Sequence, residues 1–167
     1  MQTVRLERPD DRDAIDRVQR LAFGRAEEAA LVHALRDAGA AVVSLVAEDE
    51  GTVVGHALLS PVSIAGHDGA GLGLGPIGVL PGHQRRGIGS SLVRRALEEC
   101  RRLGHSVVVV LGGPEFYARF GFVPAAGHGL RCEYDVPEES FMVARLAPVA
   151  LREPRGLVRY HSAFADV

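Results

Sequence analysis

Residues 71–113 contain the pattern that most restricts the fold of this chain, because strand, glycine-rich turn, helix and strand follow one another without interruption. The first strand is predicted around Leu72–Leu80. Apolar residues then recur at helical spacing from Ile88 to Leu103, and Gly104 ends this helix. The segment "HSVVVVLGG" is a short continuous apolar run, typical of a strand covered on both faces. This order predicts a parallel strand–helix–strand unit.

The segments on either side of this unit alternate between strand and helix patterns. Val4–Arg8 alternates apolar and charged residues like a short edge strand. The other predicted elements are helices from Asp10 to about Phe23 and from Arg25 to near Gly39, a hairpin with its turn at Asp49–Gly51 and its second strand over Thr52–Ile64, a turn at Gly66–Gly69, a short aromatic helix "PEFYARF", and two strands at about Phe122–Tyr134 and Phe141–Leu146. Together they predict an α/β (α+β) fold with a mixed sheet.

Length and composition are those of one globular domain. The chain has 167 residues, of which 47% are hydrophobic and 24% charged, so a packed core is feasible without disulfides or metals. We expect one domain over residues 1–147, with residues 148–167 as an ordered tail packed on the same domain.

Composition and charge exclude several function classes. No apolar run approaches the roughly 18 residues that span a bilayer, and Met1–Asp10 is too charged for a secretory signal, so we expect a cytoplasmic protein. The net charge is −2 and no arginine block is longer than a pair, which argues against nucleic-acid binding. Cys100 and Cys132 have no neighbours at metal-ligand spacing, so we expect reduced thiols and no metal site.

Two phosphate-binding motifs can be excluded for the glycine-rich region. All 19 basic residues are arginines, whereas a Walker-type loop requires a lysine beside its last glycine. The segment "GLGPIG", Gly73–Gly78, matches G-x-G-x-x-G, but a dinucleotide-binding fold requires a helix to begin at these glycines. Val79, Leu80 and Pro81 follow instead. We therefore interpret the match as coincidental and the segment as a bulged strand.

The turn Gln84–Gly89 directly precedes an amphipathic helix and is suited to binding an anion. The first N–H groups of a helix lack internal partners, and Gly87 and Gly89 remove side chains that would cover them. The helix dipole, Arg85 and Arg86 add positive potential. The alternative is a tight helix entry with solvated arginines, and the spacing alone does not decide between the two.

In its context this turn resembles the GNAT superfamily of N-acetyltransferases. "IGVLPGHQRRGIGSSLV" is similar to the acetyl-CoA-binding signature of that family, Q/R-x-x-G-x-G/A after a bulged strand, and "FYARFGF" resembles its later Y-x-x-x-G-F segment. The tail, with "VRYHSAF", resembles a bacterial subgroup of predicted acetyltransferases. The resemblance implies a single GNAT-type domain whose mixed sheet has a bulged strand, parallel strands that splay apart, and helices on both faces.

The resemblance also implies acetyl-CoA as cosubstrate. Ile77 and Val79 would contact the pantetheine arm through their backbone, with Gly78 allowing close approach. The pyrophosphate would be held by the turn and the helix start, which comprise Gln84, Arg85, Arg86, Gly87, Ile88, Gly89 and Ser90. The splayed strands would open the slot in which the thioester and the amine meet.

Tyr117 is the candidate general acid. Acetyl transfer to an amine requires an unprotonated nitrogen, stabilisation of the oxyanion and a proton for the departing thiolate. A backbone N–H of the bulged strand, assigned to Val79, would stabilise the oxyanion. The phenol of Tyr117, with a reference pKa of about 10, would protonate the sulfur. Alternatively, Tyr117 packs beside Phe116, Phe120 and Phe122 in an aromatic cluster.

The general base is left open by the sequence. Some members of the family carry a glutamate on the bulged strand, but Leu72–Leu80 contains no titratable residue. The candidates, each with a structural alternative, are Glu27, Glu28, His33, His56, Glu115 and His128. A water relay or an amine that arrives neutral is equally compatible. Gly112 and Gly113 stand where relatives often have Asn or Asp, so a polar contact to pantetheine or substrate is expected to be missing.

We therefore expect an acetyl-CoA-dependent N-acetyltransferase that acts on a primary amine of a small molecule or peptide by direct attack in a ternary complex. Acceptor contacts are expected from Arg25–Glu28 and Gly127–Glu139, whose acidic residues favour a cationic acceptor. Arg119 is expected to face solvent, with a contact to a cofactor phosphate as the alternative. Tyr160 and His161 are expected to pack with the tail, with closure over the slot as the alternative. The alternative is a non-catalytic acyl-CoA-binding or sensing module. A homodimer through an edge strand is compatible with the pattern, but no feature determines it.

Overall fold

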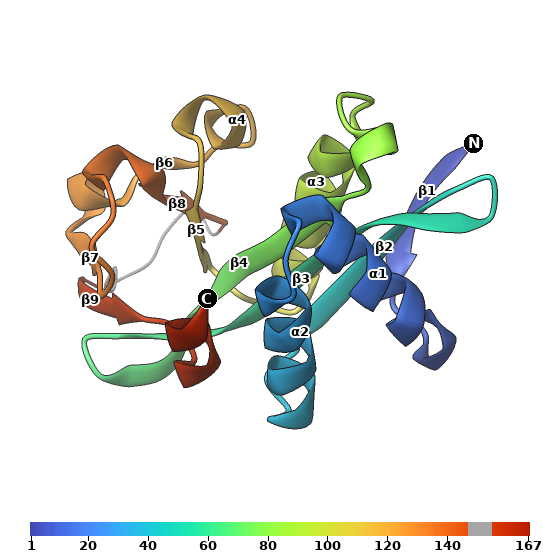
Figure 1. Ribbon diagram of the computed structural model, residues 1–167. Helices are drawn as coiled ribbons and strands as arrows, with labels where there is room; N and C mark the ends of the chain where they lie inside the picture. The colour runs from blue at the N-terminus through green and yellow to red at the C-terminus, as the bar shows by residue number, and fades with distance from the viewer. Residues whose placement is uncertain (147–154) are drawn as a thin grey trace.

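The computed structural model describes residues 1–146 and 155–167 (Figure 1). Its strands are β1 (Gln2–Leu6), β2 (Val43–Asp49), β3 (Thr52–Ile64), β4 (His67–Val79), β5 (Val107–Leu111), β6 (Val123–Pro124), β7 (Leu130–Cys132), β8 (Phe141–Arg145) and β9 (Gly156–Arg159). Its α-helices are α1 (Arg12–Phe23), α2 (Glu27–Asp37), α3 (Ile88–Arg102) and α4 (Pro114–Ala118). Short 3₁₀ helices are η1 (Pro9–Asp11), η2 (Pro81–His83), η3 (Ala125–His128), η4 (Glu138–Ser140) and η5 (Ser162–Asp166).

The strands form one mixed sheet in the order β1-β2-β3-β4-β5-β8-β6, with β9 paired to β3 and β7. β4 and β5 are parallel, as are β7 and β9, and the other described pairings are antiparallel. The expected α/β class with a mixed sheet is confirmed. β1 lies at one edge of the sheet, and the homodimer through an edge strand stays a prediction.

Helices cover both faces of the central strands, as the sequence predicted (Figure 1). On one face, a Cβ placed on Gly55 would lie 3.1 Å from side-chain atoms of Ile88 and Leu92 in α3. On the other, a Cβ placed on Gly78 would lie 3.1 Å from Ala22 in α1. Such close approaches leave no room for side chains at these two positions, so the glycines allow the helices to pack directly against the strands.

The β3–β4 hairpin is tighter than the sequence suggested. The expected turn at Gly66–Gly69 is wrong, because Ala65 and Gly66 alone form the turn, with φ angles of 51° and 82°. Ile64 then pairs directly with His67, so β4 begins five residues before the expected Leu72. Two successive residues with positive φ match the twist of a two-residue hairpin, which lets the strands pair immediately.

The expected bulge in the glycine-rich strand is present. Ala57 of β3 pairs with Ile77 while Leu59 pairs with Leu74, so β4 carries one more residue than β3 between these pairs. The extra residue falls at Gly75, whose φ of 147° favours glycine, and the Gly75–Pro76 peptide is cis. "GLGPIG" therefore lies inside a strand and does not begin a helix.

The single strand expected over Phe122–Tyr134 is wrong. This segment contains two short strands, β6 and β7, separated by η3. Pro124 precedes the 3₁₀ turn and Gly129 ends it with a φ of 72°. Proline and glycine interrupt the alternation that a continuous strand needs.

The tail joins the same sheet. Val158 and Arg159 of β9 pair with Ile64 and Ser63 at the end of β3. The expected boundary between the domain and the tail, residues 147 and 148, lies outside the described residues and stays a prediction. Among the described helices, none is both long and apolar enough to cross a membrane.

Candidate functional site

The second half of β4 turns backbone hydrogen-bonding groups toward an open edge. The N–H of Leu80 donates to the carbonyl of Val54 in β3 (2.9 Å). Successive residues of an antiparallel strand face alternate sides, so the N–H and C=O groups of Ile77 and Val79 face away from β3. On that side the pairing with β5 ends at Leu74. An extended ligand can therefore pair with Ile77 and Val79 like an added strand.

A cavity of about 410 Å³ lies beyond the end of β4, at the N-terminus of α3. We call it the glycine-turn cavity, and it is lined by Val79, His83, Gln84, Arg85, Gly87, Ile88, Gly89, Ser90, Phe116 and Arg119. Arg85 and Gly87 have left-handed backbone conformations, with φ angles of 64° and 81°. Alternation of right- and left-handed residues creates concave backbone surfaces that bind anions, and the dipole of α3 favours negative charge at this end.

Arg119 contributes a cation to the glycine-turn cavity and is also exposed to solvent, as the sequence predicted. Its Nη2 donates to Ser90 Oγ (3.0 Å). The guanidinium lies over the rings of Phe116 and Phe120, with 5.4 Å and 5.5 Å to the ring centroids. These contacts hold Arg119 beside the start of α3.

The predicted cofactor residues divide between two places. Most of them line the glycine-turn cavity, namely Val79, Gln84, Arg85, Gly87, Ile88, Gly89 and Ser90. Arg86 and Gly78 do not line it. Gln84 also fastens the turn to the strand, because its side-chain amide donates to the Val79 carbonyl (3.1 Å). The absence of a side chain at Gly78 has a structural explanation: a Cβ there would lie 3.0 Å from Gln19 Oε1 of α1. Ile77 lines the second cavity.

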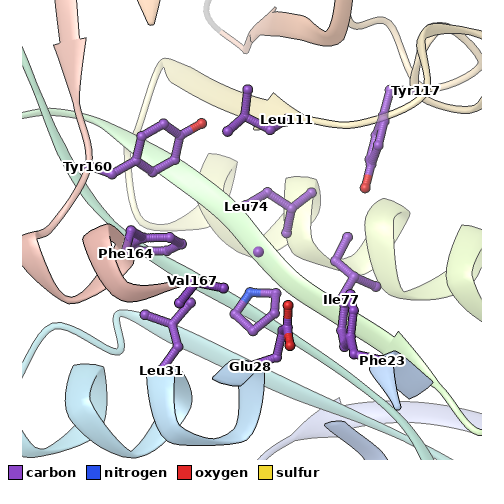
Figure 2. A pocket seen from close by; sticks show the side chains of 12 residues that line it. Phe23, Glu28, Leu31, Leu74, Ile77, Leu111, Tyr117, Tyr160, Phe164 and Val167 are labelled. Carbon is purple, nitrogen blue, oxygen red and sulfur yellow. The ribbon is translucent and has the colours of Figure 1, made fainter. Parts of the chain in front are cut away.

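The second cavity, of about 360 Å³, lies where β4 and β5 part (Figure 2). We call it the Tyr117 cavity. Its lining residues come from α1, α2, β4, β5, α4 and the tail, and are Phe23, Glu28, Leu31, Leu74, Gly75, Pro76, Ile77, Leu111, Tyr117, Tyr160, Phe164 and Val167. It is predominantly apolar with a few polar groups, as small-molecule sites usually are.

Tyr117 points its hydroxyl into this cavity, toward Ile77 (Figure 2). Its ring contacts Phe116 and Phe122 edge-on, at centroid distances of 5.0 Å and 5.6 Å. Burial raises the pKa of Tyr117 to about 12. The sequence presented two alternatives for Tyr117, namely packing in the aromatic cluster and a catalytic role. In the structure the ring packs in the cluster while its hydroxyl reaches the cavity. The phenol stays protonated at neutral pH and can donate a hydrogen bond.

Gly112 makes the position of Tyr117 possible. A Cβ on Gly112 would lie 2.3 Å from Cε2 of the Tyr117 ring, whereas nothing lies within 4 Å of a Cβ on Gly113. The Cε2 edge of the ring thus packs closely against the backbone at the end of β5. The glycine that departs from the family pattern at this position is therefore explained by the aromatic ring above it.

Among the candidate bases, Glu28 alone lines the Tyr117 cavity. The Glu28 side chain is 6% exposed, and both carboxylate oxygens accept from Arg25, through Nε (2.9 Å) and Nη2. Glu27 and Glu115 are exposed. His33 is half-exposed, and its Nε2 lies 2.9 Å from Asp16 Oδ1 of α1. His128 accepts from Arg145 Nε (3.3 Å), away from this cavity.

His56 is excluded as a base by its surroundings. It is fully buried, and its Nε2 and Nδ1 lie 2.8 Å from Ser44 Oγ and 2.7 Å from Gln19 Nε2. Ser44 donates its proton to Glu7, so Nε2 of His56 carries the ring proton and Nδ1 accepts from Gln19. Burial lowers the pKa of His56 to about 3. The neutral imidazole therefore supports the sheet behind β4.

The tail forms one wall of the Tyr117 cavity, the position that the sequence offered as the alternative for Tyr160 and His161. Tyr160 packs with the tail as expected, stacking near Tyr134 and Phe164 at centroid distances of 6.1 Å and 5.2 Å, but it also lines the cavity. His161 caps η5 through Nδ1 (3.1 Å from the N–H of Ala163) and does not line the cavity. Gly73 makes room for this ring, because a Cβ there would lie 2.8 Å from the Tyr160 ring.

The second expected source of acceptor contacts does not reach this cavity. None of residues 127–139 lines it; several of them instead line a separate cavity with Ala126 and Phe141. Over residues 1–146 and 155–167, no group of three or more His, Cys, Asp or Glu residues is arranged to hold a metal ion.

Comparison with known proteins identifies the family. Residues 3–125 match the model of the acetyltransferase (GNAT) domain. An uncharacterized N-acetyltransferase of Escherichia coli K12, YhbS, is 41% identical over 162 residues, which cover 96% of this chain and 97% of the relative.

Solved structures agree over nearly the full length. The E. coli YhbS structure, determined in complex with CoA, has a TM-score of 0.92 at 41% identity and covers 98% of this chain and 92% of that one. A GNAT acetyltransferase from Brucella melitensis, in complex with acetyl-CoA, has a TM-score of 0.83 at 37% identity and covers 98% of both chains.

Proposed function

The chain belongs to the GNAT superfamily of N-acetyltransferases, and from this premise we propose that it transfers an acetyl group from acetyl-CoA to a primary amine by direct attack in a ternary complex. One observation carries the proposal. The open edge of β4 joins the two cavities, because Val79 lines the glycine-turn cavity and Ile77 lines the Tyr117 cavity. An extended arm along this edge can connect an anion held by the turn with chemistry beside Tyr117.

The described residues fit acetyl-CoA at both ends of this edge. The N–H groups at the start of α3, with Ser90 and Arg119, are suited to the pyrophosphate. The carbonyl of Ile77 and the backbone groups of Val79 would pair with the amide groups of the pantetheine arm. Bound in this way, the cosubstrate supplies an acetyl group activated as a thioester. Arg86 lines neither cavity, so we assign it no direct contact.

The backbone donor to the developing oxyanion is better assigned to Ile77 than to Val79. Both N–H groups face the open edge, but only Ile77 lines the cavity into which Tyr117 points its hydroxyl. A fixed backbone donor at the reacting carbonyl stabilises charge without reorganisation.

Two side chains of the Tyr117 cavity can accept and donate the protons that the reaction transfers. The amine nitrogen forms the new bond to the acetyl carbon, the carbon–sulfur bond breaks, and the nitrogen loses one proton while the sulfur gains one. We assign proton acceptance to Glu28 and donation to Tyr117. The raised pKa of Tyr117 matches this role, because the same desolvation raises the proton affinity of a thiolate that leaves beside it.

A non-catalytic acyl-CoA-binding module is the less favoured alternative. This alternative was based on the lack of a general base in the glycine-rich strand and on Gly112 and Gly113, which offer no polar side chain to a substrate. Glu28 lies in the cavity, and Gly112 makes room for Tyr117. Both features favour catalysis over simple binding.

Calorimetric titration with acetyl-CoA, followed by thiol release with a panel of amines, tests the proposal. We expect saturable binding and amine-dependent thiol release. Tyr117→Phe should lower turnover about a hundred-fold while cofactor affinity is retained, because only the proton donor is removed. Tyr134→Phe is the matched control, since Tyr134 does not line the cavity. Binding without thiol release would support the non-catalytic module, and no binding at millimolar acetyl-CoA would reject both. A cytoplasmic location remains our expectation.

A further inference from the structure

Tyr160 has a buried hydroxyl that no described residue satisfies. Tyr160 is 8% exposed, and its Oη has no hydrogen-bond partner among residues 1–146 and 155–167. The hydroxyl points toward Leu111, on the side of the Tyr117 cavity opposite Tyr117 (Figure 2). An unpaired buried hydroxyl is unfavourable and rare in folded proteins, so such a group needs an explanation. A ligand in the cavity would provide its partner.

Glu28 marks the other end of the cavity. Its carboxylate lies on the side of Ile77 and Phe23, toward which Tyr117 also points (Figure 2). Glu28 is the only acidic side chain among the described residues that line this cavity. Its partner Arg25 is half-exposed and has a long flexible side chain. The Arg25 guanidinium can therefore move away from Glu28 when an ammonium group binds there. The reactive end of the cavity is thus acidic.

Apolar side chains occupy the space between these two ends. The walls there are formed by Leu31, Leu74, Leu111 and Phe164. A charged group held against such walls would lose its hydration without gaining a partner. A volume of about 360 Å³ admits a small molecule and leaves little room for a folded chain segment.

We infer that the acceptor is a small monoamine with an apolar, preferably aromatic, body and a neutral hydrogen-bonding group at its far end. Its ammonium form binds beside Glu28 and loses one proton to solvent before the neutral nitrogen attacks. Its body lies between the apolar walls, and its far group pairs with the hydroxyl of Tyr160. The inference rests on the proposed acetyl transfer and specifies the substrate class. Glu28 and Tyr160 would act as specificity residues at opposite ends of one molecule.

A diamine is the competing acceptor that the structure makes worth testing. Glu27 and Asp166 line a neighbouring cavity, which shares only Leu31 and Val167 with the Tyr117 cavity. A long diamine would have to pass these apolar residues to bring its second nitrogen to Glu27 or Asp166. We therefore expect the monoamine to be preferred.

The test compares acceptors of similar length at saturating acetyl-CoA, using thiol release for rates. The panel contains tyramine, phenylethylamine, hexylamine, diaminohexane and an alanyl-alanine amide. We expect kcat/KM for phenylethylamine to exceed that for diaminohexane about ten-fold or more, because a second ammonium would be buried unpaired. Tyramine should exceed phenylethylamine by about three- to ten-fold, the usual effect of one buried hydrogen bond.

Two variants with matched controls assign the ends of the cavity. Tyr160→Phe should reduce the ratio of kcat/KM for tyramine to that for phenylethylamine to about one, whereas Tyr134→Phe should preserve that ratio. Glu28→Gln should raise KM for every amine about ten-fold or more, whereas the exposed neighbour variant Glu27→Gln should not. An unchanged tyramine advantage in Tyr160→Phe would overturn the assignment of Tyr160.

Binding measurements keep the outcomes separate. If diaminohexane or the dipeptide amide is acetylated better than phenylethylamine, the proposed function stands and the inference on substrate class is wrong. If no amine is acetylated, calorimetry of phenylethylamine and tyramine against the protein saturated with CoA decides. Tighter binding of tyramine, lost in Tyr160→Phe, would support the inference without turnover, and absence of binding by either amine at millimolar concentration would reject it.

Discussion

The two cavities that meet at β4 are built in opposite ways. The glycine-turn cavity takes most of its lining from residues 79–90, which are contiguous in the sequence. The Tyr117 cavity takes its lining from six segments, which reach from Phe23 in α1 to Val167 in the tail. The first offers backbone groups and a helix N-terminus, whereas the second offers side chains on an apolar surface.

This difference separates what a cosubstrate needs from what an acceptor needs. A phosphate-bearing cosubstrate can be held by backbone N–H groups, which one short motif supplies regardless of most side chains. An acceptor must be distinguished from other amines, which requires particular side chains that converge from distant elements. Changes in the first cavity should therefore alter cofactor affinity, and changes in the second should alter turnover.

The largest expected effect comes from Gly112→Ala. The new Cβ would lie 2.3 Å from the Tyr117 ring, so the ring must move and its hydroxyl leaves its position. Displacement of a catalytic group by about 1 Å costs on the order of a hundred-fold in rate. We expect kcat to fall by about this factor, with acetyl-CoA affinity unchanged by calorimetry. Gly113→Ala is the matched control, because its Cβ meets nothing within 4 Å. Equal losses in both variants would contradict this role of Gly112.

Protonation of His56, in the strand β3 beside β4, should instead affect both cavities because it lowers the stability of the folded protein. Burial lowers the pKa of His56 to about 3, whereas an unfolded histidine has a pKa of about 6.5. Between these values the unfolded chain binds a proton that the folded chain does not, so stability falls as the pH falls. We expect a slope on the order of 1 kcal/mol for each pH unit below about pH 6.

Urea unfolding between about pH 7 and pH 5 measures this slope before most carboxylates titrate. His56→Gln should flatten it, because the buried imidazole is then absent. A slope that persists in His56→Gln would show that another group binds the proton.

Gly87→Ala should alter affinity without altering chemistry. Gly87 has a φ of 81° at the start of α3, and a Cβ there meets nothing within 4 Å, so the cost is backbone strain alone. Strain of about 1 kcal/mol corresponds to a roughly five-fold weaker acetyl-CoA affinity. Turnover at saturating acetyl-CoA should stay constant. Gly82→Ala, which has neither positive φ nor a near contact, is the control. A fall in kcat rather than affinity would break the proposed division of labour.

The fold could be predicted wherever periodicity and turn residues are local. α1, α3 and the β2–β3 hairpin were predicted nearly to their ends, because amphipathic spacing and glycine turns determine them. The segment Phe122–Tyr134 was predicted wrongly, since its short strands exist only through pairing with β8 and β9. β9 itself was not predicted, because its partners Ser63 and Ile64 are almost a hundred residues away.

The candidate site follows the same division. The contiguous Gln84–Ser90 turn could be singled out from the sequence alone, and it lies at a cavity as expected. Glu28 was one of six candidate bases, and nothing in the sequence distinguished it before the fold brought it beside Tyr117. For Tyr160 the sequence favoured packing with the tail over closure of the slot, because its position in the cavity wall depends on β9 joining the sheet.

The smallest expected effect belongs to the arginines of the turn. Both Arg85 and Arg86 are exposed, and only Arg85 lines the glycine-turn cavity. Exposed charges are screened by salt, so the double variant Arg85→Gln/Arg86→Gln should weaken acetyl-CoA binding only about two- to three-fold at about 0.15 M salt, and less at higher salt. Residue 85 has a φ of 64°, and glutamine, like arginine, carries a side chain at this position. The backbone strain is therefore the same in both proteins, and the comparison isolates the charge. A loss exceeding about twenty-fold would mean that side-chain charge, rather than backbone N–H groups, holds the cosubstrate, and the contrast between the two cavities would fail.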